Sequence, residues 1–245
     1  MQVIDLRKSF NGHQVLNGIN LEVRCGEIFV IMGPSGSGKS VLLKHLIGLE
    51  RSDSGTIRIA GNLIDSPELL SKYRMAMVFQ SGALLSSLSV AQNVGLYLAE
   101  HRLKPRKEID RIVAEKLAIV GLTDAANQMP NELSGGMKKR VAIARALVIE
   151  PQFIFYDEPT SELDPLISVT IGEEIVRMRD QTNATTIVVT HDRDLALGIA
   201  DRMAIIRSGE ILALGTPEEV YRSEKTEVQE FLNAGLKRKP IEKAL

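Results

Sequence analysis

Residues 33–40 constrain the fold of this chain more than any other stretch. Their letters, GPSGSGKS, fit the pattern G-x-x-x-x-G-K-[ST], and they lie between the apolar run IFVIM and the segment KSVLLKHLIGL, whose apolar residues have helical spacing. A phosphate-binding loop needs a strand, a glycine loop and a helix in this order, because the glycines let backbone N–H groups turn toward phosphate oxygens where the helix starts. The stretch therefore predicts an α/β fold that binds a nucleotide.

The residues of this loop have separate expected roles. Lys39 is expected to reach the β- and γ-phosphates, and the Ser40 hydroxyl is expected to ligate Mg²⁺. The other positions expected to bind phosphate are Gly33, Pro34, Ser35, Gly36, Ser37 and Gly38. The motif alone leaves kinases, GTPases, ATPases and motor proteins as alternatives.

Net charge, cysteine count and the length of apolar runs argue against several other classes of protein. The net charge of −1 gives no basic field that would draw the chain onto nucleic acid, and the lone Cys25 cannot form an intrachain disulfide. The first letters, MQVIDLRKSF, lack the apolar region of a secretory signal, and the apolar runs are far shorter than the roughly 20 residues of a membrane span. We therefore expect a cytosolic protein without a nucleic-acid partner, which reaches a membrane only through other subunits.

The pattern along the chain indicates an α/β core interrupted by helices. Apolar alternation around the turn signal Asn11-Gly12 predicts paired strands, and apolar runs at MAMVFQ, FIFYD and TTIVVT predict further strands. Near the end, MAIIRSGEILALG predicts a hairpin that turns at Ser208-Gly209. Helical spacing dominates residues 82–150, including a helix with Pro105 in its first turn.

Asp157 and Glu158 end the apolar run FIFYDE. An aspartate at the carboxyl end of a buried strand beside a phosphate loop can hold Mg²⁺. The carboxylate that follows is placed to orient or deprotonate an attacking water, which favours hydrolysis over transfer to an organic acceptor. Two acids can also mark nothing more than a strand end, but their combination with the phosphate loop favours the functional interpretation.

A second glycine-rich segment, LSGGMKKR at residues 133–140, opens another predicted helix. Ser134 is expected to cap this helix, while Gly135 and Gly136 would let a phosphate approach its free N–H groups. One interpretation is a plain helix cap. The other is a site that covers the γ-phosphate of a nucleotide bound to a second copy, so that two copies related by a twofold axis enclose two nucleotides.

Together these motifs resemble the nucleotide-binding subunits of ABC transporters, and the resemblance runs to about Gly235. GPSGSGKS is similar to the Walker A motif, FIFYDE to Walker B with its catalytic glutamate, LSGGM to the signature loop, and SELD, at 161–164, to the D-loop. The resemblance implies that Phe10 stacks on adenine, that Gln80 touches Mg²⁺ and senses a transmembrane partner, and that His191 contacts the γ-phosphate. Core packing for Phe10 and a structural role for His191 are the alternatives that the residues alone leave open.

The resemblance also implies a domain layout. We expect a P-loop NTPase fold of the ABC ATPase type, with an antiparallel β subdomain and an inserted helical subdomain. A single domain over 1–235 would contain a core at 1–81 and 151–215, a helical subdomain at about 82–150 and C-terminal helices at 216–235. The basic residues 236–245 are expected to form a solvated tail, with contact to anionic lipid as the alternative.

A narrower resemblance rests on Met137 and Lys139, which occupy positions where many members carry glutamine. With FQSGALLSSLSVAQNV this variant is similar to the ATPase subunit of bacterial MCE-type phospholipid (Mla-like) transporters. That implies ATP hydrolysis with Mg²⁺ at the inner membrane, transmembrane permease subunits, a second copy of the chain, an MCE-domain lipid-binding protein and a small accessory subunit. The alternatives are an importer or exporter of another substrate, and a soluble ABC-type ATPase that acts on ribosomes or DNA.

Glu162 is a further departure, because related proteins often carry alanine or glycine there. A carboxylate near the seam between two copies adds repulsion toward nucleotide phosphates unless a cation answers it. We therefore expect Glu162 to slow closure or hydrolysis. A groove around residues 80–100 is expected to receive a cytoplasmic helix of the membrane partner.

Overall fold

The computed structural model describes residues 1–66 and 72–233, so the basic tail predicted at 236–245 lies outside the described residues. The first two strands of the chain belong to an antiparallel sheet with the strand order β2-β1-β4-β5. Its strands are β1 (Gln2–Phe10), β2 (His13–Glu22), β4 (Ser54–Ile59) and β5 (Asn62–Leu63). Asn11 (φ 49°) and Gly12 (φ 80°) both have left-handed backbone, as a two-residue hairpin turn between twisted strands requires. The predicted first hairpin is confirmed.

A second sheet has the strand order β10-β9-β3-β8-β7-β6. Its strands are β3 (Ile28–Met32), β6 (Met75–Val78), β7 (Phe153–Asp157), β8 (Thr185–Thr190), β9 (Arg202–Arg207) and β10 (Glu210–Gly215). Neighbouring strands are parallel except for β9 and β10, which form the predicted hairpin at Ser208-Gly209. Every residue of β3 and β8 is buried, which explains why β3 is apolar throughout and why β8, TTIVVT, consists of β-branched residues without an exposed face.

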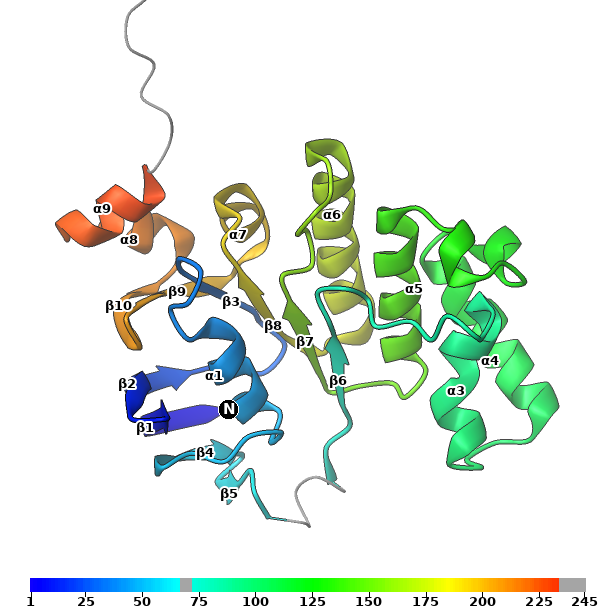
Figure 1. Cartoon of the computed structure of the whole chain (residues 1–245), viewed down its shortest axis with the longest axis horizontal. Coiled ribbons are helices and arrows are strands. Elements are labelled where there is room, and N and C mark those ends of the chain that lie inside the picture. Colours follow the sequence, from blue (N-terminus) through cyan, green and yellow to red (C-terminus); the bar gives the residue numbers. More distant parts are fainter. Residues whose placement is uncertain (67–71, 234–245) are drawn as a thin grey trace, which may run out of the picture.

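The helices fall into three groups, which Figure 1 shows along the length of the molecule. α3, α4 and α5 follow β6 in the chain and gather at one end of the molecule, away from the antiparallel sheet. α1, α6 and α7 adjoin the second sheet, and α8 and α9 close the chain. Their bounds are α1 (Lys39–Leu46), α3 (Val90–Glu100), α4 (Arg106–Ile119), α5 (Gly135–Leu147), α6 (Pro165–Thr182), α7 (Arg193–Ile199), α8 (Pro217–Tyr221) and α9 (Thr226–Leu232), with short 3₁₀ turns at Thr123–Ala125 and Pro130–Glu132.

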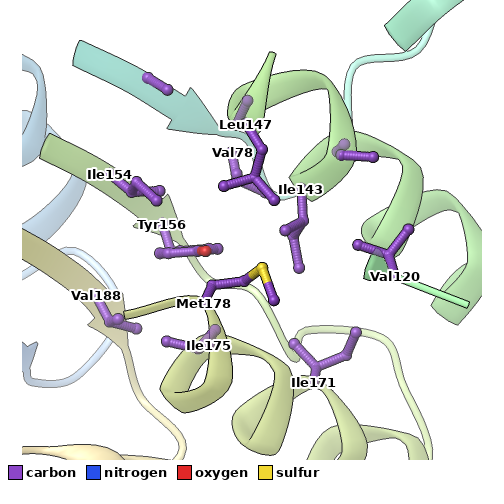
Figure 2. Packing of buried hydrophobic residues seen from close by; sticks show 14 of the residues in the cluster. Val78, Val120, Ile143, Leu147, Ile154, Tyr156, Ile171, Ile175, Met178 and Val188 are labelled. Carbon is purple, nitrogen blue, oxygen red and sulfur yellow. The ribbon is translucent and has the colours of Figure 1, made fainter. Parts of the chain in front are cut away.

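Two apolar clusters hold these parts together. One joins β3 and α1 to the antiparallel sheet, and the other runs from the second sheet through α5 and α6 to α3 and α4. Figure 2 shows part of the second cluster, in which Tyr156 of β7 and Met178 of α6 face the α5 side chains Ile143 and Leu147. Because this cluster is continuous, burial of apolar surface fixes the inserted helices against the sheet. The subdomain bounds given above stay a proposal.

Some helix starts differ from the sequence prediction. Pro105 is the N-cap of α4 and not part of its first turn, because its ψ of 152° is extended, and the helix begins one residue later. The helix after the phosphate loop ends at Leu46, earlier than the apolar spacing indicates, and Gly48 turns the chain with a φ of 77°. At the start of α3, Ser89 and Gln92 form a reciprocal capping box, a pairing that marks a helix N-terminus in the sequence.

Candidate active site

The phosphate loop follows β3 and leads into α1 at the carboxyl edge of the second sheet, where open α/β sheets bind ligands. Two of its glycines are required by their surroundings. A Cβ at Gly33 would overlap the carbonyl oxygen of Ile206. Gly38 caps α1 with a φ of 97°, and a Cβ there would lie 2.7 Å from the carbonyl oxygen of Val15. The loop is thus wedged between β9 and β2, which fixes its N–H groups relative to the sheet.

Lys39 is the first residue of α1, and its buried side chain reaches back to the start of the loop. Its ammonium donates hydrogen bonds to the carbonyls of Gly33, at 2.8 Å, and Pro34, at 3.0 Å, and lies 3.7 Å from Oε1 of Glu158. Burial lowers the pKa of Lys39, and the charges of Glu158 and Asp157 act against that shift. A cation with incomplete charge compensation in this position suits an anionic ligand such as a phosphate.

Ser40 and Asp157 form an oxygen pair beside this cation. The Ser40 hydroxyl donates to Oδ1 of Asp157 at 2.9 Å, which brings the start of α1 to the end of β7. Burial raises the pKa of Asp157, and the hydrogen bond from Ser40 partly offsets that effect. A divalent cation would stabilise the buried carboxylate, and Mg²⁺ binds through one or two carboxylates, a hydroxyl and substrate phosphates. This pair therefore fits Mg²⁺, although the residues described contain no cluster of three His, Cys, Asp or Glu side chains with metal-binding geometry.

Glu158 and His191 form the second pair of the site. His191 Nδ1 lies 2.8 Å from Oε2 of Glu158, and the His191 backbone N–H donates to the same oxygen at 3.3 Å. Glu158 has a left-handed φ of 48°, and its own N–H donates to the carbonyl of Val189 at 2.8 Å. Holding a non-glycine residue in this region costs about 1–3 kcal/mol, and the β7–β8 register that fixes it aims the carboxylate into the site. A carboxylate oriented by an imidazole is the arrangement that a general base needs.

Gln80 and Phe10 are the two expected site residues that lie after β6 and at the end of β1. Gln80 follows β6 and lines, with His191 and Glu162, a groove of about 1160 Å³. Phe10 ends β1 with 40% of its surface exposed, and the Lys8 ammonium lies 5.0 Å from its ring centroid. That exposure excludes core packing for Phe10, and stacking on adenine stays a prediction. None of the hydrogen bonds or ion pairs within the described residues joins either side chain to the phosphate loop.

The second glycine segment forms a helix cap within its own chain. Ser134 has the extended backbone of an N-cap, and its Oγ accepts from the Met137 N–H at 3.3 Å. A Cβ at Gly136 would lie 2.7 Å from Cγ2 of Ile167, so this glycine lets α5 approach α6 closely. Ser134 and Gly135 are exposed. The structure therefore confirms that Ser134 caps α5. Contact of this segment with a nucleotide bound to a second copy stays a prediction.

Two basic side chains of α5 escaped the functional reasoning from sequence. Lys139 is only 6% exposed, and its ammonium donates to the carbonyls of Gln80 and, at 3.3 Å, Glu158. Arg145 donates to the carbonyls of Gly82, at 2.8 Å, and Ala83, at 2.7 Å. The sequence contains a signal for the burial of Lys139, because its helical spacing puts Lys139 on the same face of α5 as Gly136 and Ile143, and that face is buried.

Comparisons with known proteins agree with this geometry. The profile of a family described as "ABC transporter" matches residues 16–161, more than half of the chain. The "Probable ribonucleotide transport ATP-binding protein mkl" of Mycobacterium tuberculosis is 39% identical over 237 residues, which cover 95% of this chain and 66% of that protein. The "sn-glycerol-3-phosphate import ATP-binding protein UgpC 1" of Rhizobium etli is 40% identical over 226 residues, which cover 92% of this chain and 65% of that protein. The chain thus spans about two thirds of the length of these two relatives.

A plant relative and two solved structures extend the likeness. The Arabidopsis thaliana "Protein TRIGALACTOSYLDIACYLGLYCEROL 3, chloroplastic" is 39% identical over 252 residues, covering 95% of this chain and 73% of that protein. The dimeric ATP-binding cassette MJ0796, bound to ADP and Pi in a post-hydrolysis state, has a TM-score of 0.78 and 31% identity, covering 88% of this chain and 98% of that one. CbiO1 of Clostridium perfringens has a TM-score of 0.83 and 32% identity, covering 95% and 94%.

These matches confirm the predicted fold class. The names of the relatives refer to different substrates, so the likeness to phospholipid transporters is not shown by them. No helix in the part of the chain that the structure describes is long and apolar enough to cross a bilayer. The chain belongs to the ABC transporter family and is one of its ATP-binding cassettes, an ATPase.

Proposed function

We propose that this chain is the ATP-hydrolysing subunit of a transporter that moves phospholipids or related lipids across the cell envelope. Its site supports hydrolysis through one observation above all: Glu158 contacts His191 on one side and lies 3.7 Å from Lys39 on the other. A carboxylate between a cation and an imidazole is held where it can accept a proton from water near the phosphate loop.

The proposed division of roles follows from these positions. Ser40, Gln80 and Asp157 would hold Mg²⁺, which when bound neutralises charge on the phosphates. Glu158 accepts the proton of the attacking water, and His191 keeps the Glu158 carboxylate oriented and contacts the γ-phosphate. Lys39 and the N–H groups of the phosphate loop stabilise the charge that develops on the γ-phosphate oxygens. Phe10 supports the adenine ring by stacking.

We propose that a second copy completes the site. Ser134, Gly135 and Gly136 of one copy would cover the γ-phosphate held by Lys39 of the other, since Ser134 and Gly135 at the start of α5 are exposed residues. The MJ0796 cassette is dimeric in a state that holds ADP and Pi, which supports this arrangement. Closure would draw on contacts of both faces with ATP, and hydrolysis would remove those contacts and reopen the dimer.

The proposed membrane partners are permease subunits. A groove of about 770 Å³ lies between α3 and α4 on one side and the segments around Ile47 and Tyr73 on the other, with exposed Tyr97 and Leu103 in its wall. This groove overlaps the predicted 80–100 region only at its end. Its mixture of apolar and charged residues suits a short amphipathic helix. We place the chain in the cytoplasm, peripheral on the inner membrane, with an MCE-domain lipid-binding protein and a small accessory subunit as further proposed partners.

The lipid substrate is supported by two observations. The segment LSGGMKKR departs from the more common glutamine pattern in the way that the Mla-like ATPases do. One relative, at 39% identity, bears the name of a galactolipid, a diacylglycerol with sugar units. The second candidate function is import of a polar substrate, favoured by the ribonucleotide and glycerol-3-phosphate names of other relatives.

Purification in mild detergent from the native host tests the proposal. We expect the chain to copurify with permease subunits and with phospholipid detectable by mass spectrometry. Phospholipid added to the purified complex should raise its ATPase rate, and Glu158→Gln should abolish that response. Stimulation by glycerol phosphate or a nucleotide with none by lipid would contradict the lipid proposal, and copurification with ribosomes alone would contradict transport.

A further inference from the structure

Lys139 joins three parts of the molecule that carry proposed catalytic groups. It lies on α5, Gln80 follows β6, and Glu158 follows β7. The Lys139 ammonium donates to the carbonyls of both Gln80 and Glu158, and Lys139 is only 6% exposed. A displacement of α5 relative to the sheet therefore acts on the backbone of both residues through one side chain.

The Glu158 carbonyl accepts several hydrogen bonds in the turn that follows β7. It accepts hydrogen bonds from the Ser161 N–H at 3.2 Å and from the Ser161 hydroxyl at 2.9 Å, in addition to the Lys139 ammonium. Glu158 itself has a φ of 48°. Because the strained peptide and the carboxylate belong to one residue, loss of a bond at this carbonyl lets the carboxylate drift from its place beside His191.

Carbonyls and carboxylates stabilise the buried ammonium. Burial lowers the pKa of Lys139, and the charge of Glu162, followed by those of Glu158 and Asp157, acts against that shift. Because burying a cation is costly unless polar or charged partners answer it, the two carbonyls that accept from Lys139 also hold its ammonium in place.

Two neighbouring basic residues act as internal comparisons. Arg145 also holds the segment after Gln80, through Gly82 and Ala83, but the structure gives it no hydrogen bond to residues 157–163 within the described chain. Lys138 lies next to Lys139 on α5, and its side chain takes part in none of the hydrogen bonds or ion pairs formed by the described residues. The link between Gln80 and Glu158 is therefore a property of Lys139.

We propose that Lys139 is a positioning residue that sets the relative placement of Gln80 and Glu158. Position 139 is one at which the chain departs from the pattern common in its family. The inference rests on the proposed roles of Gln80 in holding Mg²⁺ and of Glu158 as general base.

The test compares Lys139→Met, Lys139→Arg and the control Lys138→Met in this chain. Lys139→Met keeps the length of the side chain but removes its donors, and it should lower kcat about 10- to 100-fold, because a displacement of about 1 Å in a catalytic group has that order of effect. KM for ATP should change less than about twofold, since the phosphate-loop contacts remain. Lys139→Arg should retain most of kcat, and Lys138→Met should match the wild type. A Lys139→Met variant with wild-type kcat would overturn the positioning role.

A readout without turnover separates this inference from the base role of Glu158. Amide hydrogen exchange in residues 158–163 should accelerate in Lys139→Met and stay unchanged in Lys138→Met. Unchanged exchange in Lys139→Met would overturn the inference. If Glu158→Gln retained full turnover, the base role would fail, while the exchange experiment would still decide whether Lys139 positions this turn.

Discussion

His191 Nδ1 and Glu158 Oε2 lie 2.8 Å apart, which makes the imidazole the direct neighbour of the proposed base. The two side chains differ in environment, since that of Glu158 is 13% exposed and that of His191 is 58% exposed. The shielded carboxylate lies against the phosphate loop, and the exposed imidazole lies at the groove that Gln80 and Glu162 also line. A contact made by His191 at that groove is therefore transmitted to the carboxylate through one hydrogen bond.

Glu158→Gln should abolish hydrolysis while preserving ATP binding. An amide retains the shape of the side chain and a hydrogen bond to His191, but it cannot accept the proton of water, and general bases contribute about 10²- to 10⁴-fold. Single-turnover hydrolysis and equilibrium binding of a fluorescent ATP analogue measure the two effects. Full turnover in this variant would remove Glu158 from the role of base.

Ser40→Ala should weaken Mg²⁺ more than it weakens the nucleotide. The substitution removes one oxygen donor and the hydrogen bond to Asp157, and a contact worth about 1.4 kcal/mol corresponds to tenfold in affinity. Titration of ATPase activity with Mg²⁺ at saturating ATP should show a half-maximal concentration raised about tenfold or more. Ser37→Ala, in the same loop, is the control, and an equal shift in both variants would refute a specific role for Ser40.

The fold and the phosphate loop were predictable because both depend on local letters. The buried parallel strand β3 is apolar throughout, and a glycine with left-handed backbone such as Gly38 follows directly from the loop motif. The contacts of Lys139 were not predictable, because they join α5 to residues far away in the chain and depend on how helix and sheet pack. The start of α4 was missed by one residue, since Pro105 is compatible with both an N-cap and a first turn.

Gly136→Ala should destabilise the single chain even without nucleotide. Its Cβ would lie 2.7 Å from Ile167 Cγ2, so the Ile167 side chain or the two helices must shift, and overpacking of this kind costs about 1–3 kcal/mol. Each kcal/mol corresponds to roughly 2–4 °C in Tm for a domain of this size. Gly198→Ala is the matched control, because nothing lies within 4 Å of its Cβ, and it should leave Tm unchanged or raise it. A wild-type Tm for Gly136→Ala would show that the close approach of the two helices has no energetic weight.

Phe10→Ala should weaken binding of ATP. Stacking of a base on an aromatic side chain is worth about 1–3 kcal/mol, so the affinity should fall by about 5- to 150-fold. Tyr221→Ala is a suitable control, because Tyr221 is an exposed aromatic residue on α8, remote in sequence from the loop. Calorimetry of both variants with ATP and with inorganic triphosphate should show a loss for ATP alone in Phe10→Ala, whereas an equal loss for both ligands would exclude stacking on the base.

The central claim is that hydrolysis needs two copies, each supplying Ser134, Gly135 and Gly136 to the nucleotide of the other. The most direct measurement is the ATPase rate per chain of wild type and Gly135→Asp over a range of protein concentrations, with mass measured by light scattering. The account predicts that the wild-type rate rises as dimers form, and that Gly135→Asp binds ATP normally as a monomer yet hydrolyses it at no concentration. Hydrolysis by Gly135→Asp at the wild-type rate, in samples that remain monomeric, would contradict it.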